Sequence, residues 1–154
     1  MERDSQRVRR TREIEALRQE AAPALHGLCA TLVESINRLV TRVRIELDPS
    51  EYTRDGPPRD VQVFQINVSG RVVQITFRPT ETLTSAERFH LPYILEGAIR
   101  WYNQESLDRE EVGEHHLFCC VEKETAGWYF LDPGSRRNGR LNQEYLVELM
   151  EKLV

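Results

Sequence analysis

The side chains with the most obvious chemical potential stand together in the segment His115-His116-Leu117-Phe118-Cys119-Cys120. Imidazole and thiolate groups are preferred ligands of zinc. On a β-strand, however, His116 and Cys120 would share a face with Cα atoms about 13 Å apart, too far for metal bonds of about 2.0–2.3 Å. Only a helix would let residues four apart chelate one ion, and the flanking sequence favours a strand. We therefore predict no metal site and no cofactor.

A second candidate site is the turn-rich loop 132–140, which precedes a predicted helix. Guanidinium groups, together with backbone N–H groups at glycine turns and at a helix start, can bind a phosphate or a carboxylate. The loop matches neither the P-loop nor the dinucleotide-binding pattern. The alternative is a solvated loop whose arginines pair with nearby acidic residues. The residues of the predicted anion site are Ser135, Arg136, Arg137 and Arg140.

Aromatic side chains are concentrated in two late segments, 101–102 and 128–130. On a sheet they can stack on nucleic-acid bases or pack inside a core. Base stacking normally accompanies an excess of positive charge, whereas this chain has 21 basic and 25 acidic residues and a net charge of −4. The sequence therefore argues against nucleic-acid binding. Because no GxSxG, HExxH or Ser-His-Asp pattern is present, we predict no catalytic residue.

Length and cysteine content narrow the class of protein further. A chain of 154 residues fits a single domain, and we expect one domain over residues 1–154. The three cysteines form no CxxC pair, which favours reduced thiols and a cytoplasmic protein over a disulfide scaffold. No apolar run approaches the roughly 20 residues of a membrane span, so we expect no contact with a membrane.

The elements that would position these side chains begin with a long helix. Nine apolar residues recur at steps of three and four, the spacing of one helix face. Pro23 lies within this stripe and cannot donate a backbone hydrogen bond, which predicts a kink or break near Glu20–Ala22. Residues 1–12 carry mixed charges and are expected to be either a frayed end or a partner-binding arm. The stripe consists of Ile14, Leu17, Ala21, Leu25, Leu28, Leu32, Ile36, Leu39 and Val43.

The clearest strands flank Ser69-Gly70 and predict a hairpin of residues 61–68 and 71–78. A two-residue turn sets Ile66 opposite Val73 and Phe64 opposite Ile75, on the face that helices should cover. Upstream, residues 43–47 also alternate, so the long helix either continues or gives way to a short strand there.

The segment 91–102 fits both helical and strand spacing, and we interpret it as a strand because Gly97 weakens a helix interior. Residues 104–114 are polar and are expected to form a connection, followed by strands at 115–122 and 127–132. A closing helix is predicted after Asn142, a good N-cap, with Leu141 packing on Leu146.

Together these elements predict an α+β fold with about five mostly antiparallel strands and with both terminal helices on one face. The favoured function is a non-catalytic binding or protein-interaction module that self-associates. One alternative is a small-ligand-binding cup or small enzyme with a cavity between helices and sheet. The other is a nucleic-acid binder that uses the loop 136–140.

The length of the first helix motivates the prediction of a homodimer. Residues 14–43 would span about 45 Å as a helix, whereas an eight-residue strand spans only about 26 Å. Either the helix folds back at Pro23, or its first half projects and buries Ile14 and Leu17 against a second chain. Because the apolar period continues before the proline, we predict a homodimer with Ile14 and Leu17 at its interface.

Overall fold

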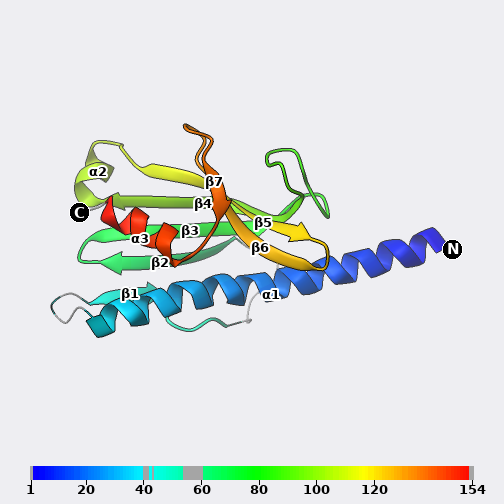
Figure 1. Cartoon of the computed structure of the whole chain (residues 1–154), viewed down its shortest axis with the longest axis horizontal. Coiled ribbons are helices and arrows are strands. Elements are labelled where there is room, and N and C mark those ends of the chain that lie inside the picture. Colours follow the sequence, from blue (N-terminus) through cyan, green and yellow to red (C-terminus); the bar gives the residue numbers. More distant parts are fainter. Residues whose placement is uncertain (1, 40–41, 43, 54–60, 153–154) are drawn as a thin grey trace.

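The fold is a seven-stranded antiparallel sheet covered on one face by two helices (Figure 1). The computed structural model describes residues 2–39, 42, 44–53 and 61–152. The strands lie in the sheet in chain order, and the predicted α+β class is confirmed. The helices are α1 (Glu2–Leu39), α2 (Gln104–Asp108) and α3 (Gln143–Glu151). The strands are β1 (Ile45–Asp48), β2 (Gln62–Val68), β3 (Arg71–Pro79), β4 (Tyr93–Asn103), β5 (Gly113–Glu122), β6 (Thr125–Leu131) and β7 (Asn138–Arg140).

The expected number of about five strands was too low because the two edge strands are short. For residues 43–47 the sequence allowed either more helix or a short strand. In the part of this segment that the structure describes, the strand is present and belongs to β1. β7 lies inside the segment 132–140, which we expected to be a turn-rich loop. Its sequence, Asn-Gly-Arg, has no β-branched or aromatic residue, so its pairing with β6 comes from tertiary context and not from propensity.

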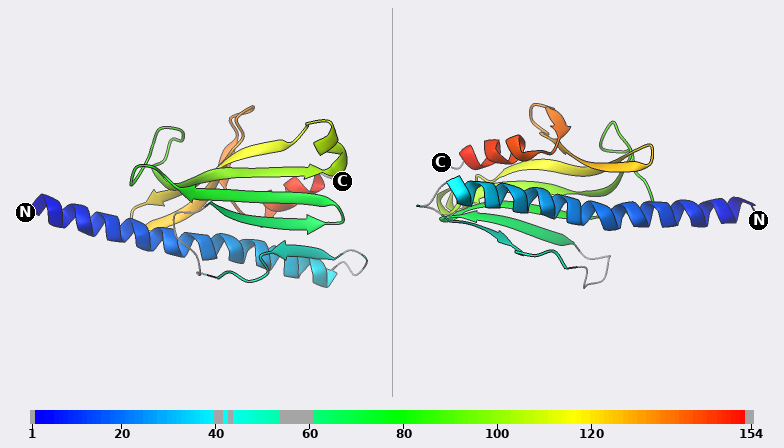
Figure 2. Two further views of the ribbon diagram at one scale, coloured as in Figure 1. Left: turned by 180° about the vertical axis from the view of Figure 1, so that it is seen from behind. Right: turned by 60° about the horizontal axis from the view of Figure 1, so that its bottom comes forward.

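Helix α1 passes through Pro23 without interruption, so the predicted break is wrong. Figures 1 and 2 show one continuous, gently curved helix. The turns around the proline bury Ala21, Ala22 and Leu25 against the same sheet, which holds both halves in line. In addition, the indole Nε1 of Trp128 on β6 donates a 2.9 Å hydrogen bond to the carbonyl of Ala21. Packing therefore compensates for the backbone hydrogen bond that the proline removes.

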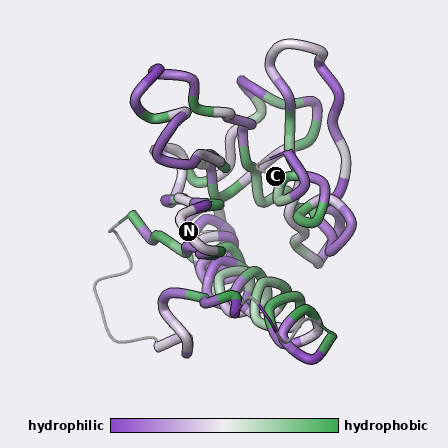
Figure 3. The backbone as a smooth tube through the Cα atoms, turned by 90° about the vertical axis from the view of Figure 1, so that its left-hand side faces the viewer, coloured by the Kyte–Doolittle hydropathy of each residue, from purple (hydrophilic) through white to green (hydrophobic). Residues whose placement is uncertain are grey.

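From Ile14 to Ile36 the apolar stripe of α1 is buried or partly buried against the core, as its spacing predicted, but Leu39 is 85% exposed. Val43 lies outside the described residues. Near the end of the helix, Asn37 contacts the sheet. Its side-chain amide donates to the carbonyl of Ile45 at 2.9 Å and accepts from its N–H at 2.8 Å. Figure 3 shows α1 beneath the sheet, with hydrophobic and hydrophilic residues alternating around its turns.

The hairpin of β2 and β3 has the predicted register, with Ile66 opposite Val73 and Phe64 opposite Ile75. All four side chains are at most 2% exposed and belong to the main core between the sheet and the helices. The segment 91–102 is a strand, as predicted, from Tyr93 onward, and the strand ends at Asn103. A Cβ atom at Gly97 would collide with the backbone of Thr76 and Phe77, which confirms that this glycine permits a close approach of two strands.

The opposite face of the sheet is uncovered along β2, β3 and most of β4, as the view from behind shows (Figure 2, left). Over β4 to β6 it carries a smaller core of Phe89, Tyr93, Phe118 and Cys120. Phe89 belongs to residues 80–92, which connect β3 to β4 and which we call the strap. The later part of the strap, with Phe89 and Leu91, folds back over this second face and gives the sheet a partial second layer, whereas Leu83 packs against the main core.

Phe64 tests the main core because it contacts both the sheet and α1. We expect Phe64→Ala to reduce the free energy of unfolding by about 3–5 kcal/mol, since it leaves a cavity where the ring packs against Phe77 and His26. Urea denaturation measures this. The neighbouring Val63, 42% exposed, supplies a control, because Val63→Ala removes a side chain from the other face. An unchanged midpoint for Phe64→Ala would contradict this packing.

Candidate functional site

A largely buried group of titratable side chains comes together where α3 packs on the sheet. His115 on β5 has its Nδ1 2.7 Å from the Tyr145 hydroxyl on α3. Its Nε2 lies 3.6 Å from a carboxylate oxygen of Asp132, which follows β6. The imidazole also stands edge-on to Trp101, with ring centroids 4.7 Å apart. His115 and Tyr145 are buried, whereas Asp132 is partly exposed.

Local structure fixes each member of this cluster. The side chain of Asn142 accepts a 2.8 Å hydrogen bond from the N–H of Tyr145, which confirms the predicted N-cap and sets the first turn of α3. Asp132 accepts from the N–H of Gly134 at 2.9 Å and from the Ser135 hydroxyl at 2.8 Å. The carboxylate is thereby held at the edge of the cluster by its own turn.

The electrostatics of the cluster favour a neutral imidazole and an ionised Asp132. Burial lowers the pKa of His115; Asp132 raises it, and Lys152, Arg137 and His116 lower it further. The hydrogen bonds from Ser135 and Gly134 lower the pKa of Asp132. Burial raises the pKa of Tyr145, so its phenol stays protonated and can donate to Nδ1.

An acid, an imidazole and a hydroxyl in a row are the components of a nucleophilic triad, but this group lacks an accessible nucleophile. The hydroxyl belongs to Tyr145, which is 4% exposed and has a raised pKa. The arrangement instead joins α3 and the turn after β6 to the sheet. Sequence reasoning considered His115 only as a metal ligand; its pairing with Tyr145 depends on how α3 docks, which no local pattern reveals.

The predicted anion site is arranged around an internal carboxylate. The Ser135 hydroxyl and the Gly134 N–H, donors expected to meet an external anion, bind Asp132. Arg137 pairs with Glu148 on α3 at 3.2 Å. The exposed Arg136 adopts a left-handed backbone conformation with φ 63°.

The structure does not bring the arginines of this loop together. The Arg137 guanidinium lies 5.7 Å from the ring of Phe130, and that of Arg140 lies 5.9 Å from the ring of Tyr129. Because Phe130 and Tyr129 are adjacent on β6, they point to opposite faces of the sheet. The two guanidinium groups are therefore on opposite sides of the sheet edge.

The segment 115–120 is a strand, as predicted, so His115 and Cys119 face the helices whereas His116 and Cys120 face the strap. Among the described residues, no group of three or more His, Cys, Asp or Glu side chains could hold a metal ion. All three cysteines are free and buried. Of the late aromatics, Trp128 and Phe130 are in the main core, and Tyr129 packs on the other face.

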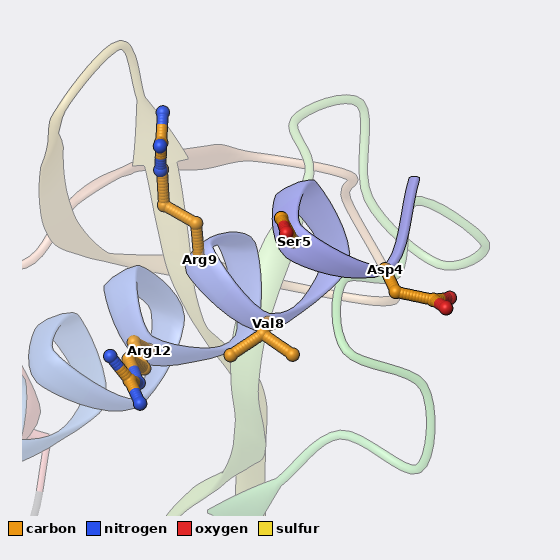
Figure 4. A pocket seen from close by; sticks show the side chains of 5 residues that line it. All are labelled: Asp4, Ser5, Val8, Arg9 and Arg12. Atoms are coloured by element: carbon orange, nitrogen blue, oxygen red, sulfur yellow. The ribbon is translucent and has the colours of Figure 1, made fainter. Parts of the chain in front are cut away.

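The first turns of α1 project beyond the sheet (Figure 1). Residues 4–13 of α1, which we call the arm, all have exposed side chains. A hollow of about 420 Å³ lies along the arm and is open to solvent. Figure 4 shows that its lining side chains come from this one helix, so no second element encloses a ligand there. They are Asp4, Ser5, Val8, Arg9 and Arg12.

The residues predicted to form a dimer interface lie next to the arm but are covered by their own chain. Ile14 is fully buried in the main core, and Leu17 is partly buried against it. In this conformation Ile14 offers no surface to a second chain. The reason is that the strap and β4 lie beside this part of α1, where Arg18 binds the carbonyls of Leu83 and Ile94.

No protein-family model matches the chain, and no match was found among curated proteins or solved structures. Among the described helices, none combines the length and the apolar character that crossing a membrane would require.

His115 predicts how stability depends on pH. Its lowered pKa in the folded chain means that the unfolded chain binds the proton more readily, so stability is full above about pH 6.5 and falls as the pH drops below it. Urea denaturation from about pH 8 to about pH 5 measures this slope. In His115→Gln the slope should become smaller but not vanish, because the pKa of His116 is lowered too. His90→Gln, at an exposed site, is the control; equal slopes in His115→Gln and the unchanged chain would refute the assignment.

The absence of a metal site remains a prediction with a direct test. We expect elemental analysis to find no stoichiometric zinc in the purified protein, and EDTA to leave its melting temperature unchanged. The physical reason is that β5 places His116 and Cys120 four strand positions apart. One zinc per chain, with unfolding when it is removed, would contradict the prediction.

Proposed function

We propose that the protein is a non-catalytic interaction module that self-associates through its arm. The observation that carries this proposal is the run of ten exposed helical residues from position 4 to position 13. The 38 residues of α1 span about 57 Å, whereas β4, the longest strand with 11 residues, spans about 36 Å. About 20 Å of helix therefore extends past the sheet and is available to another molecule.

The charge of the arm suggests what it contacts. The arm has four arginines and two acidic residues. In Figure 1 its end and α2 lie at opposite ends of the molecule. The segment 104–114, which contains α2 and leads into β5, has five acidic residues and one arginine. Opposite charges of this kind favour encounter and fix the orientation of partners. A second copy of the chain thus offers a surface complementary to the arm.

Such a contact would join two different surfaces and would be head-to-tail. It replaces the interface expected at Ile14 and Leu17, which the chain covers itself. The arm has one large apolar residue exposed, Val8 at 51%, so association would depend mainly on charge. Charge-dependent contacts weaken with salt, which gives the proposal a specific signature.

Sedimentation velocity over a range of protein concentrations tests the proposal. We expect dimers or larger species at about 0.1 M salt and their loss at about 1 M, where the Debye length falls from about 10 Å to about 3 Å. The double variant Arg9→Glu/Arg12→Glu should be monomeric at both. The matched control Arg44→Glu/Arg78→Glu changes net charge equally at exposed sites outside the arm and should still associate. A monomer at every concentration would refute self-association.

A shorter chain that begins at Glu13 provides a second test, because it lacks most of the arm but keeps Ile14 for the core. We expect its melting temperature to stay close to that of the full chain while its association is lost. Association that persists without the arm would show that another surface is responsible.

A further inference from the structure

The strap is held on the open face of the sheet by a small set of aromatic contacts. Phe89 stacks on Phe118 of β5, with ring centroids 4.9 Å apart and planes at 19°. Tyr93, at the start of β4, packs on the same ring at 4.6 Å. The backbones of Ser85 and Tyr93 exchange hydrogen bonds of 2.7 and 2.9 Å, which close the strap at its base. Beneath these groups lies Cys120, which is fully buried.

Arg88 makes two polar contacts between the tip of the strap, residues 86–91, and the sheet. Its backbone N–H donates to the Tyr93 hydroxyl at 3.2 Å, and its guanidinium group approaches His116. A guanidinium nitrogen of Arg88 lies 3.1 Å from Nδ1 of His116 on β5. A guanidinium group has only N–H donors, so this contact is a hydrogen bond only when Nδ1 carries a lone pair. The same guanidinium lies 5.7 Å from the ring of Phe118. Neutral His116 thus accepts from Arg88, whereas protonated His116 would present a second donor and a like charge.

The pKa of His116 depends on its neighbours, one of which is Arg88 on the strap. Burial and the positive charge of Arg88 lower its pKa, and Glu114, two residues earlier on β5, raises it. From β4, Glu96 and Arg100 are on the same face as His116, and Arg100 lies 3.6 Å from the Glu114 carboxylate. On the other side β6 places the apolar Leu131 opposite His116. In this environment Arg88 is the group whose bond depends on a neutral His116.

We propose that the strap is a pH-dependent latch, in which protonation of His116 breaks its bond with Arg88 and releases the tip of the strap, residues 86–91, from the second face. Release uncovers the aromatic ring of Phe118 and the thiol of Cys120, which are hidden when the latch is closed. The base of the strap keeps several anchors that do not titrate with His116: the backbone pair of Ser85 with Tyr93, and the hydrogen bonds of Arg18 to Thr80 and to the Leu83 carbonyl. At the tip, aromatic stacking and the hydrogen bond from the Arg88 N–H to the Tyr93 hydroxyl remain, so the tip loosens while the base stays attached. This device is independent of the arm and goes beyond the proposed self-association.

Cys120 provides the readout because its neighbour serves as an internal control. Cys119 faces the helices, and burial raises the pKa of both thiols, that of Cys120 to about 12. Opening of the strap exposes Cys120 alone, whereas global unfolding exposes Cys119 and Cys29 as well. Site-resolved labelling therefore separates the two events.

The experiment measures labelling of the full chain by 4,4′-dithiodipyridine at about pH 5.5 and about pH 7.5, on either side of the ordinary histidine pKa of about 6.5. Mass spectrometry of fragments assigns the labelled thiol, and the denatured chain at each pH corrects for the reactivity of the reagent. We expect Cys120 to be labelled several-fold faster at the lower pH, with Cys119 and Cys29 protected at both.

Three variants decide the mechanism. His116→Gln keeps an acceptor for Arg88 that does not titrate, so labelling of Cys120 should be slow at both pH values. Arg88→Leu removes the donor, so labelling should be fast at both. His90→Gln, an exposed histidine on the strap itself, should retain the pH response of the unchanged chain. The latch is refuted by the absence of a pH response, by its persistence in His116→Gln, or by joint labelling of Cys119 and Cys120.

Discussion

The packing of α1 against one face of the sheet is the constraint on which the rest of this structure depends. Hydrogen bonds at three points along the helix fix its position: Arg18 to the carbonyls of Leu83 and Ile94, Trp128 to the carbonyl of Ala21, and Asn37 to the backbone of Ile45. Between these three points the apolar stripe of α1 fills the space between the helix and the sheet. Because the helix is held at these points and is longer than the strands, its first ten or so residues have no sheet beneath them.

The alternation of side chains along β5 explains why residues that look like one site belong to two. His115 and Cys119 point toward the helices, and His116 and Cys120 point toward the strap. His115 bonds to Tyr145 on α3, whereas His116 bonds to Arg88 on the strap. Adjacent and chemically identical side chains thus have different partners, and each histidine reports on a different layer of the molecule.

Sequence patterns predicted the parts of this fold that depend on local periodicity. The register of β2 and β3 follows from the Ser69-Gly70 turn, the strand at Gly97 from the cost of glycine in a helix, and the start of α3 from Asn142. Patterns failed where tertiary packing overrides local preference. Pro23 does not break α1 because both sides of it bury apolar residues, and β7 forms from a sequence with little strand preference.

The candidate sites were harder to predict because they depend on contacts between distant elements. The loop 132–140 has the composition of an anion site, but Asp132 uses its donors, a competition that composition alone does not reveal. Tyr145 reaches His115 only because α3 docks on β5. The strap lies between two recognisable strands and has no periodic pattern, so nothing in its sequence indicates that it folds over the sheet.

The two edges of the sheet restrict how copies of this protein can come together. β1 has four residues and β7 has three, so each edge offers only a short row of unpaired backbone groups. Short edge strands are a common protection against the sheet-to-sheet addition that leads to fibrils. With edges this short, a continuous intermolecular sheet has little backbone from which to grow, so contacts between copies would have to be made by side chains, as in the salt-sensitive contact proposed for the arm.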